Sequence, residues 1–469
     1  MNTVFKPPMP PLARYSGAGR LMPGDYWTYF RAMSRNPLEV WGEHHFQLKV
    51  APFRFLGRSS MIINDPEAIH HCFVANAANY RMNPVRQAVL KPFLRDGLLT
   101  AEGEIWKRAR KAVSPVFTPR KVNAFAPQIL KVCEDARDAY AAVDGRIISA
   151  SEAMINLTLD VLIDTLFSGD RALDKDRFTH GICELLEISG IPHVFDLLHM
   201  PGWVPRIGHG AADRVIRDLR AQVAELALLR RRTPSAEDAG RPEDFLDLLL
   251  GAGLDDTAVV DNLLTFLAAG HETTARTLTW TLYLLSQSPG ALARLEDELD
   301  TTELDASSPE NWMDALPWTQ AVIKEALRLY PSAPVLARSS IEADVVTGVP
   351  IPANTDLLVS TWLLHRHRDI WPEPDMFNPE RFMGEAGQQV DRCAYLPFGI
   401  GPRVCIGARF AMMEMVIVLA TLLKELRFQF AGHRHPLPVM RVTLQPDIEI
   451  PMKLTRRHRD TGKPAQAAP

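Results

Sequence analysis

Apolar residues recur at three- and four-residue steps along much of the chain, which is the spacing of one buried helix face. The clearest stretches are residues 124–143, 215–232, 257–287 and 408–426. A helix over 257–287 would be about 45 Å long, so it would cross a protein of this size. Shorter runs that suit strands lie at 53–64, 344–352 and 356–362. The pattern therefore predicts a mainly α fold with small β-sheets.

We expect a single domain over residues 1–469, because no repeat and no long low-complexity linker interrupts the pattern. The polar, proline-containing stretch 230–244 has the composition of an exposed loop between helices. A Pro-rich start predicts an extended N-terminal segment over 1–20, and we expect a flexible tail at 455–469. The apolar residues 190–205, which include Pro and Gly, are expected to form either a mobile lid or a buried connector.

The composition is that of an ordinary soluble globular protein, with 46% apolar residues, 23% charged residues and a formal net charge of -4. This charge gives no reason to expect a nucleic-acid partner. The longest aliphatic run, 415–423, is far shorter than the roughly 20 residues that span a bilayer. The first residues contain no signal-like apolar region. We therefore expect a cytoplasmic protein without a membrane anchor.

The stretch FGIGPRVCIG, residues 398–407, surrounds Cys405 with three glycines, a proline and an arginine. A helix pattern begins directly afterwards, and the N–H groups of a helix start favour thiolate over thiol, which lowers the pKa. A lone cysteine is most often a small buried hydrophobe. A catalytic nucleophile needs a histidine base, which this loop lacks. A thiolate metal ligand beneath a flat cofactor is the remaining functional interpretation.

The long helix pattern contains AAGHETT, residues 268–274. Ala269 and Gly270 remove bulk, so this helix can pass close to a flat cofactor. The hydroxyl of Thr273 can bond the carbonyl four residues back and open the helix locally. Glu272 beside Thr273 is an acid–alcohol pair that suits proton delivery. Taken alone, the motif is more often structural, with Glu272 on a solvated helix face and Thr273 as a back-bonded core threonine.

The cysteine loop matches the pattern F-x-x-G-x-R-x-C-x-G of the cytochrome P-450 family. The matching residues are Phe398, Gly401, Arg403, Cys405 and Gly407. AAGHETT, WKRAR (106–110), KEALRLYP (324–331) and NPERF (378–382) resemble further segments of that family. The resemblance covers nearly the whole chain. It implies a single-domain, soluble bacterial-type fold with haem b between the long central helix and the cysteine-loop helix.

The resemblance also implies roles for individual residues. Cys405 would be the thiolate ligand of the haem iron, and Glu272 with Thr273 would deliver protons for oxygen activation. Glu325 and Arg328 would form a structural triad with Arg381. The residues implied to contact the haem or its propionates are Trp106, Arg110, Arg338, Phe398, Arg403, Cys405 and Gly407. His271 has no catalytic role in the pattern.

The implied activity is insertion of one atom of O2 into a hydrophobic small molecule such as a fatty acid, terpenoid or steroid. By family position, Thr265, Phe266, Ala269 and Val335 would face this substrate. Phe266 and Val335 suit core packing equally well. The alternatives are a peroxygenase or isomerase on the same fold, which tend to lack the acid–alcohol pair, or a non-catalytic haem gas sensor or carrier.

The chain contains no dinucleotide fingerprint and no ferredoxin-type cysteine cluster. Electrons are therefore expected from a separate ferredoxin or flavodoxin with its NAD(P)H reductase. Basic residues around the implied propionate ligands and after the cysteine loop predict a basic face that docks such an acidic partner. They are Lys107, Arg108, Lys111 and Arg409.

Overall fold

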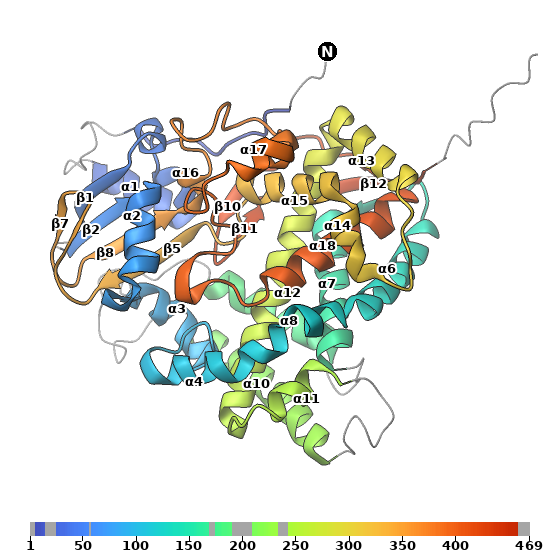
Figure 1. Ribbon diagram of the computed structural model, residues 1–469, viewed down its shortest axis with the longest axis horizontal. Helices are drawn as coiled ribbons and strands as arrows, with labels where there is room; N and C mark the ends of the chain where they lie inside the picture. Colours follow the sequence, from blue (N-terminus) through green and yellow to red (C-terminus); the bar gives the residue numbers. More distant parts are fainter. Residues whose placement is uncertain are drawn as a thin grey trace, which may run out of the picture.

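The computed structural model describes residues 5–14, 25–55, 58–167, 174–189, 209–232 and 243–457. Helices form the larger part of the molecule, and a β-rich part lies beside them (Figure 1). The predicted mainly α fold with small sheets is thereby confirmed. The expected lid or connector at 190–205 lies outside the described residues. So do 458–469 of the expected tail and residues 1–4 and 15–20 of the N-terminal segment.

The pattern at 257–287 forms a single helix, α12 (Asp256–Ser286), which runs through the middle of the helical part (Figure 1). Asp255 caps it by accepting a hydrogen bond from the N–H of Ala258, which satisfies one free amide of the helix start. The ring of Trp280 stacks on Tyr330 at 3.9 Å between centroids. The helices that pack around α12 are α7 (Ala150–Phe167), α10 (His209–Arg232), α13 (Pro289–Thr301), α15 (Pro317–Leu329) and α18 (Ala408–Leu423).

Further helices cover this centre. α6 (Ala126–Ala141) packs on α7 and α18, and α8 (Lys175–Ser189) packs on α10. The helices α6, α10 and α18 correspond to the patterns at 124–143, 215–232 and 408–426. The shorter helices are α1 (Asp25–Arg35), α2 (Pro66–His70), α3 (Pro84–Leu94), α4 (Gly103–Val113), α5 (Pro119–Asn123), α11 (Phe245–Leu250), α14 (Trp312–Ala315), α16 (Thr361–Leu364) and α17 (Gly384–Gln388).

The β-rich part is built on a five-stranded sheet in the order β1-β2-β8-β5-β3. Its neighbouring strands are antiparallel except for β2 and β8, which are parallel. The strands are β1 (Val50–Phe55), β2 (Arg58–Ile63), β3 (Tyr80–Met82), β5 (Val335–Ser340) and β8 (Asp356–Ser360). The patterns at 53–64 and 356–362 thus become β1–β2 and β8.

Three small sheets complete the described strands. The pattern at 344–352 forms the hairpin of β6 (Asp344–Val346) and β7 (Val349–Ile351). β4 (Ile147–Ser149), β12 (Pro451–Arg456) and β9 (Leu426–Phe430) form a second sheet. β10 (Pro438–Met440) pairs with β11 (Leu444–Pro446). Most of the strands in these two last sheets are only three residues long, too short to show an alternation in the sequence.

The buried apolar residues form two clusters. The larger surrounds α12, α7, α15 and α18, and the smaller lies between the five-stranded sheet and the helices beside it. Within the described ranges, no helix combines the length and the apolar character needed to cross a bilayer.

A fully buried ion pair lies on α15. Arg328 donates two hydrogen bonds of 2.7 Å to the carboxylate of Glu325. The Nε atom of Arg381 lies 3.5 Å from the same carboxylate, so the structure brings the implied triad together. Arg328 also donates to three backbone carbonyls, those of His365, Pro374 and Met376. A buried charge needs hydrogen-bond partners of this kind. The same hydrogen bonds fix the segment of chain that leads toward the cysteine loop.

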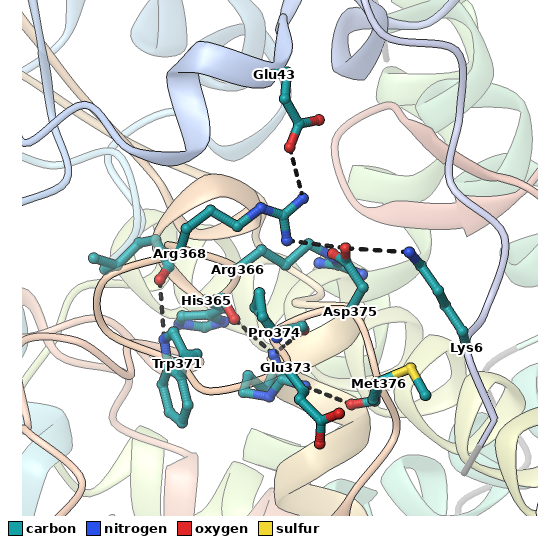
Figure 2. A network of polar contacts seen from close by, with 12 residues as sticks. Lys6, Glu43, His365, Arg366, Arg368, Trp371, Glu373, Pro374, Asp375 and Met376 are labelled. Carbon is teal, nitrogen blue, oxygen red and sulfur yellow. Dashed lines mark hydrogen bonds and ion pairs between the residues drawn. The ribbon is translucent and has the colours of Figure 1, made fainter. Parts of the chain in front are cut away.

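The same region holds the N-terminal segment in place. Figure 2 shows Arg368 between Glu43 and Asp375, at 3.1 and 2.9 Å. Lys6 approaches Asp375 at 3.7 Å from the other side. The extended start of the chain is thus anchored where it passes the segment after α16.

Candidate functional site

A cavity of about 660 Å³ lies between α12 and the cysteine loop. All thirteen site residues expected from the sequence lie in its wall. They are Trp106, Arg110, Thr265, Phe266, Ala269, Glu272, Thr273, Val335, Arg338, Phe398, Arg403, Cys405 and Gly407. Segments more than 300 positions apart in the chain therefore meet around one hollow.

The cysteine loop folds back on itself below this cavity. The N–H of Cys405 donates to the carbonyl of Phe398 at 2.9 Å, and the N–H of Val404 donates to Gly401 at 3.0 Å. Gly399 and Gly401 have φ angles of 72° and 74°, in the left-handed region that favours glycine. The sulfur of Cys405 is accessible from the cavity. The loop thus presents one thiol to the hollow in a fixed orientation.

Gly401 has a second reason to lack a side chain. A Cβ atom there would lie 1.9 Å from the carbonyl oxygen of Phe73. Phe73 belongs to a π-helical turn, η3 (His71–Ala75), a conformation that is frequent at functional sites. The Cβ position on Gly401 and the carbonyl oxygen of Phe73 are both fixed by backbone, so no side-chain rotation could relieve this collision. The cysteine loop or η3 would have to move.

The thiol of Cys405 does not behave as the helix start suggested. Although Cys405 opens to the cavity, the surrounding protein desolvates its thiol and thereby raises the pKa. A hydrogen bond from the N–H of Gly407 and the positive charge of Arg110 act in the opposite direction. The expectation of a lowered pKa is therefore wrong for the protein without a metal. Desolvation outweighs the local dipole and charge, and a cation bound to the sulfur would supply the missing stabilisation of the thiolate.

Four arginines converge at one side of the cavity: Arg86, Arg110, Arg338 and Arg403. Burial lowers the pKa of each, and the positive neighbours Arg86 and Arg403 help to lower that of Arg338 to about 9. Like charges gathered in a partly buried site repel one another unless anions lie between them.

The protein supplies one carboxylate to this cluster among the described residues. Glu102 accepts a hydrogen bond of 3.0 Å from Arg403, whose guanidinium also stacks over the ring of Trp106 at 4.5 Å. The Nη1 atom of Arg403 is buried without a hydrogen-bond partner. The excess positive charge and the orphaned donor fit a ligand that brings its own carboxylates, as the two propionates of a haem do.

The acid–alcohol pair lies on the opposite wall, on α12. Thr273 donates from Oγ1 to the carbonyl of Ala269 at 2.7 Å, the bond that its position suggested. Glu272 is buried, and its Oε1 accepts from the hydroxyl of Thr443 at 2.8 Å, in the turn between β10 and β11. Arg276 lies 3.5 Å from the same oxygen. The acid is therefore held by the protein and does not lie on a solvated helix face.

The neighbouring residues of α12 have packing roles. A Cβ atom on Gly270 would lie 3.0 Å from Leu162 of α7, so this glycine lets two helices approach closely. His271 is buried, and its Nδ1 donates to the carbonyl of Leu267 at 2.7 Å, consistent with a structural residue. Phe266 both lines the cavity and packs edge-on against Phe245 at 4.8 Å, so both interpretations of this residue hold.

Four site residues escaped the sequence analysis: Arg86, Glu102, Glu414 and Thr443. A single arginine at the start of the apolar pattern of α3 was the available signal for Arg86. Glu414 is the one acidic residue of α18, and it lines the cavity. Burial raises the pKa of its carboxyl well above the usual range, while an interaction with the hydroxyl of Thr274 acts in the opposite direction. For Arg86 and Glu414 the signal was a charged residue within a largely apolar helix, whereas no pattern in the sequence pointed to the remaining site residues.

Comparison with known proteins agrees with this geometry. The sequence profile of the family described as cytochrome P450 matches residues 43–452. Protein LUTEIN DEFICIENT 5, chloroplastic, from Arabidopsis thaliana is 32% identical over 421 residues, which cover 83% of this chain and 68% of that protein. Cyclooctat-9-en-7-ol 5-monooxygenase from Streptomyces melanosporofaciens is 32% identical over 372 residues, covering 74% and 78% of the two chains.

Among solved structures, the cytochrome P450DA heme domain superposes with a TM-score of 0.75 at 24% identity, covering 87% of this chain and 90% of that one. At this identity the likeness shows the fold. The profile match extends over most of the chain and includes both the cysteine loop and α12. The chain belongs to the cytochrome P450 family of haem monooxygenases.

Proposed function

We propose that this protein is a single-domain haem-thiolate monooxygenase that binds haem b and inserts one oxygen atom of O2 into a hydrophobic small molecule. Cys405 would hold the iron, and Trp106, Arg110, Arg338 and Arg403 would hold the propionates. Phe398 and Gly407 would border the ring. A haem held by a thiolate supplies the activation of O2 and the oxygen transfer.

The acid–alcohol pair on α12 is the observation that carries the proposal. The proton of Thr273 Oγ1 is committed to the carbonyl of Ala269, while a hydroxyl keeps two lone pairs. A water beside Thr273 would therefore donate to Oγ1 and be held in the cavity at that point. Glu272 is the neighbouring acid, and its release from Thr443 would free a carboxyl oxygen to pass a proton to this water.

The wall of the cavity favours an apolar substrate. Thr265, Phe266, Ala269 and Val335 line the cavity and would face the substrate, and most of the remaining lining residues are apolar. The name of the Streptomyces relative states a monooxygenase of cyclooctat-9-en-7-ol. Of the fatty acid, terpenoid and steroid classes, we therefore propose a terpenoid-like substrate for this chain.

Electrons would come from a ferredoxin or flavodoxin with its NAD(P)H reductase. Lys107, Arg108 and Lys111 are exposed on α4, the helix that also carries Trp106 and Arg110. Lys107 is engaged with Glu104 at 2.6 Å. A basic helix beside the propionate ligands suits an acidic donor whose approach is steered by charge.

The test is the spectrum of the reduced protein under carbon monoxide. A thiolate-ligated haem gives a strongly red-shifted Soret band, which Cys405→Ala should abolish and Cys393→Ala, at a buried cysteine of the other core cluster, should retain. With surrogate redox partners, NAD(P)H consumption should then depend on a terpenoid-like substrate and yield its hydroxylated product. A band that survives in Cys405→Ala contradicts the ligand assignment. Gas binding without turnover favours a sensor or carrier.

A further inference from the structure

The loop at residues 95–101, between α3 and α4, forms part of the cavity wall. Leu98 and Leu99 line the cavity from this loop. Arg95 has a φ angle of 46°, a conformation that non-glycine residues adopt only when the surroundings impose it. Thr100 donates to the carbonyl of Arg95 at 2.7 Å. This backbone strain has to be offset by contacts, and several of these lie outside the cavity.

Two of these contacts come from the first part of α12. The N–H of Leu98 donates to Oδ1 of Asn262 at 3.1 Å, and the N–H of Asp96 lies 3.3 Å from Oδ2 of Asp261. Both acceptors are buried. Between them, a Cβ atom on Gly97 would lie 2.2 Å from Oγ1 of Thr265. The loop backbone thus rests directly on α12, with each neighbouring amide bonded to a side chain of that helix.

A third contact comes from α10. Arg220 donates to Oδ1 of Asp261 at 2.5 Å and to the carbonyl of Phe93, in the last turn of α3, at 3.2 Å. The two charged side chains are 11% and 4% exposed. The planar guanidinium has donors in a fixed fork. The side chain of Arg220 therefore fixes how far α10 lies from α12 and from the end of α3, where the loop begins.

The polar residues Arg220, Asp261 and Asn262 do not line the cavity, whereas Leu98 and Leu99 do. We propose that Arg220, Asp261 and Asn262 form a clamp that determines specificity by setting how far Leu98 and Leu99 project into the cavity. This inference rests on the proposed function, because it concerns the ligand space beside the haem. The clamp residues are positioning residues and have no part in the chemistry.

The test compares a small and a bulky haem ligand. Imidazole and phenylimidazole, titrated by the Soret shift, differ mainly in the space that they need. The double variant Arg220→Met with Asp261→Asn removes both charges together, so no buried charge is left unpaired. The amide oxygen introduced at 261 can still accept from the N–H of Asp96. We expect unchanged imidazole affinity, and a gain in affinity for phenylimidazole of about two- to thirtyfold relative to imidazole.

Arg217→Met is the matched control, because Arg217 lies on the exposed side of the same helix, and the ratio of affinities should stay at the wild-type value. Arg220→Lys keeps the charge opposite Asp261 but lacks the fork that reaches Phe93. It should fold and give an intermediate ratio, even where the double variant does not fold. Hydrogen exchange at the amides of Asp96 and Leu98 should be slowest in the wild-type protein, faster in Arg220→Lys and fastest in the double variant, in the same order as the affinity ratios.

The outcomes separate the two proposals. An unchanged ratio in Arg220→Lys and the double variant, with a normal carbon monoxide spectrum, overturns the clamp alone. Equal weakening of both ligands indicates general loss of structure and also overturns it. A wild-type protein without the thiolate spectrum contradicts the proposed function and the clamp together.

Discussion

Two glycines of the cysteine loop provide an internally controlled prediction. Gly399 and Gly401 have nearly the same positive φ, 72° and 74°. A Cβ atom on Gly399 would meet nothing within 4 Å, whereas one on Gly401 would lie 1.9 Å from the carbonyl oxygen of Phe73. Substituting either glycine by alanine places a side chain on a residue with positive φ, and only Gly401→Ala adds a collision.

The size of each effect follows from this geometry. An alanine in the left-handed region costs about 1–2 kcal/mol, so Gly399→Ala should lower stability by roughly that amount. Ordinary contact of a Cβ atom with oxygen begins near 3.4 Å, so Gly401→Ala leaves its methyl group more than an ångström too close to η3. Overpacking of this kind costs about a further 1–3 kcal/mol, and here the loop that carries Cys405 has to move.

Two measurements separate the contributions. Urea unfolding of the haem-loaded proteins gives the difference in free energy of unfolding, and the carbon monoxide spectrum reports whether Cys405 still reaches the iron. We expect Gly399→Ala to keep the red-shifted band and Gly401→Ala to lose much of it or shed haem. Equal stability and equal spectra in the two variants would refute the reasoning, because the collision with η3 would then have no consequence.

Three further predictions concern other sites. Burial, and then the charges of Arg328 and Arg366, lower the pKa of His365 from 6.5 to about 3, so this residue gains a proton only on unfolding between these values and stability should fall as pH drops from 6.5 to about 3. His365→Gln should make that decline shallower by one proton, and an unaltered slope would contradict a neutral His365. Thr273→Ala should retain haem and ligand binding but release more peroxide per NAD(P)H consumed, with product loss of up to about 10²–10⁴-fold. An unchanged ratio of product to peroxide would mean that the α12 motif serves only in packing. Arg108→Glu should slow first-electron transfer from an acidic donor at low salt and much less at high salt, and indifference of every effective donor to both changes would remove α4 as the docking face.

Much of the fold could be predicted because its central elements follow one pattern over a long stretch. α12 and α18 begin and end within three residues of their apolar patterns, since burial on nearly all sides demands apolar residues throughout. Of the strands that were not expected, β3, β4, β10 and β11 are only three residues long and carry no period, while β5, β9 and β12 are longer. The partner of β4 is β12, which lies far away in the chain, whereas β10 and β11 pair with each other across a short turn.

The residues of the candidate site also fall into those that the sequence predicts and those that only the structure reveals. The place of Cys405, Glu272 and Thr273 in the cavity wall could be predicted because each stands in a short motif that resembles one of the family. Glu102 and Thr443 could not, because their contributions depend on contacts with Arg403 and Glu272, 301 and 171 positions away. The pKa of Cys405 was misjudged for a related reason, since the helix start is visible in the sequence while the extent of burial is not.

The length of α12 has a consequence for how such a protein can vary. Asp261, Glu272 and Trp280 lie on one rigid rod, and the first two are separated by about 16 Å along its axis. Inserting or deleting one residue between them would rotate the later part by about 100° relative to the earlier part. The contacts with the loop at 95–101 and the acid–alcohol pair could then no longer both keep their present positions. A substitution along this segment leaves the directions of the other side chains unchanged, whereas a change of length does not. Hybrid proteins that take the first half of α12 from a relative must therefore keep the number of residues.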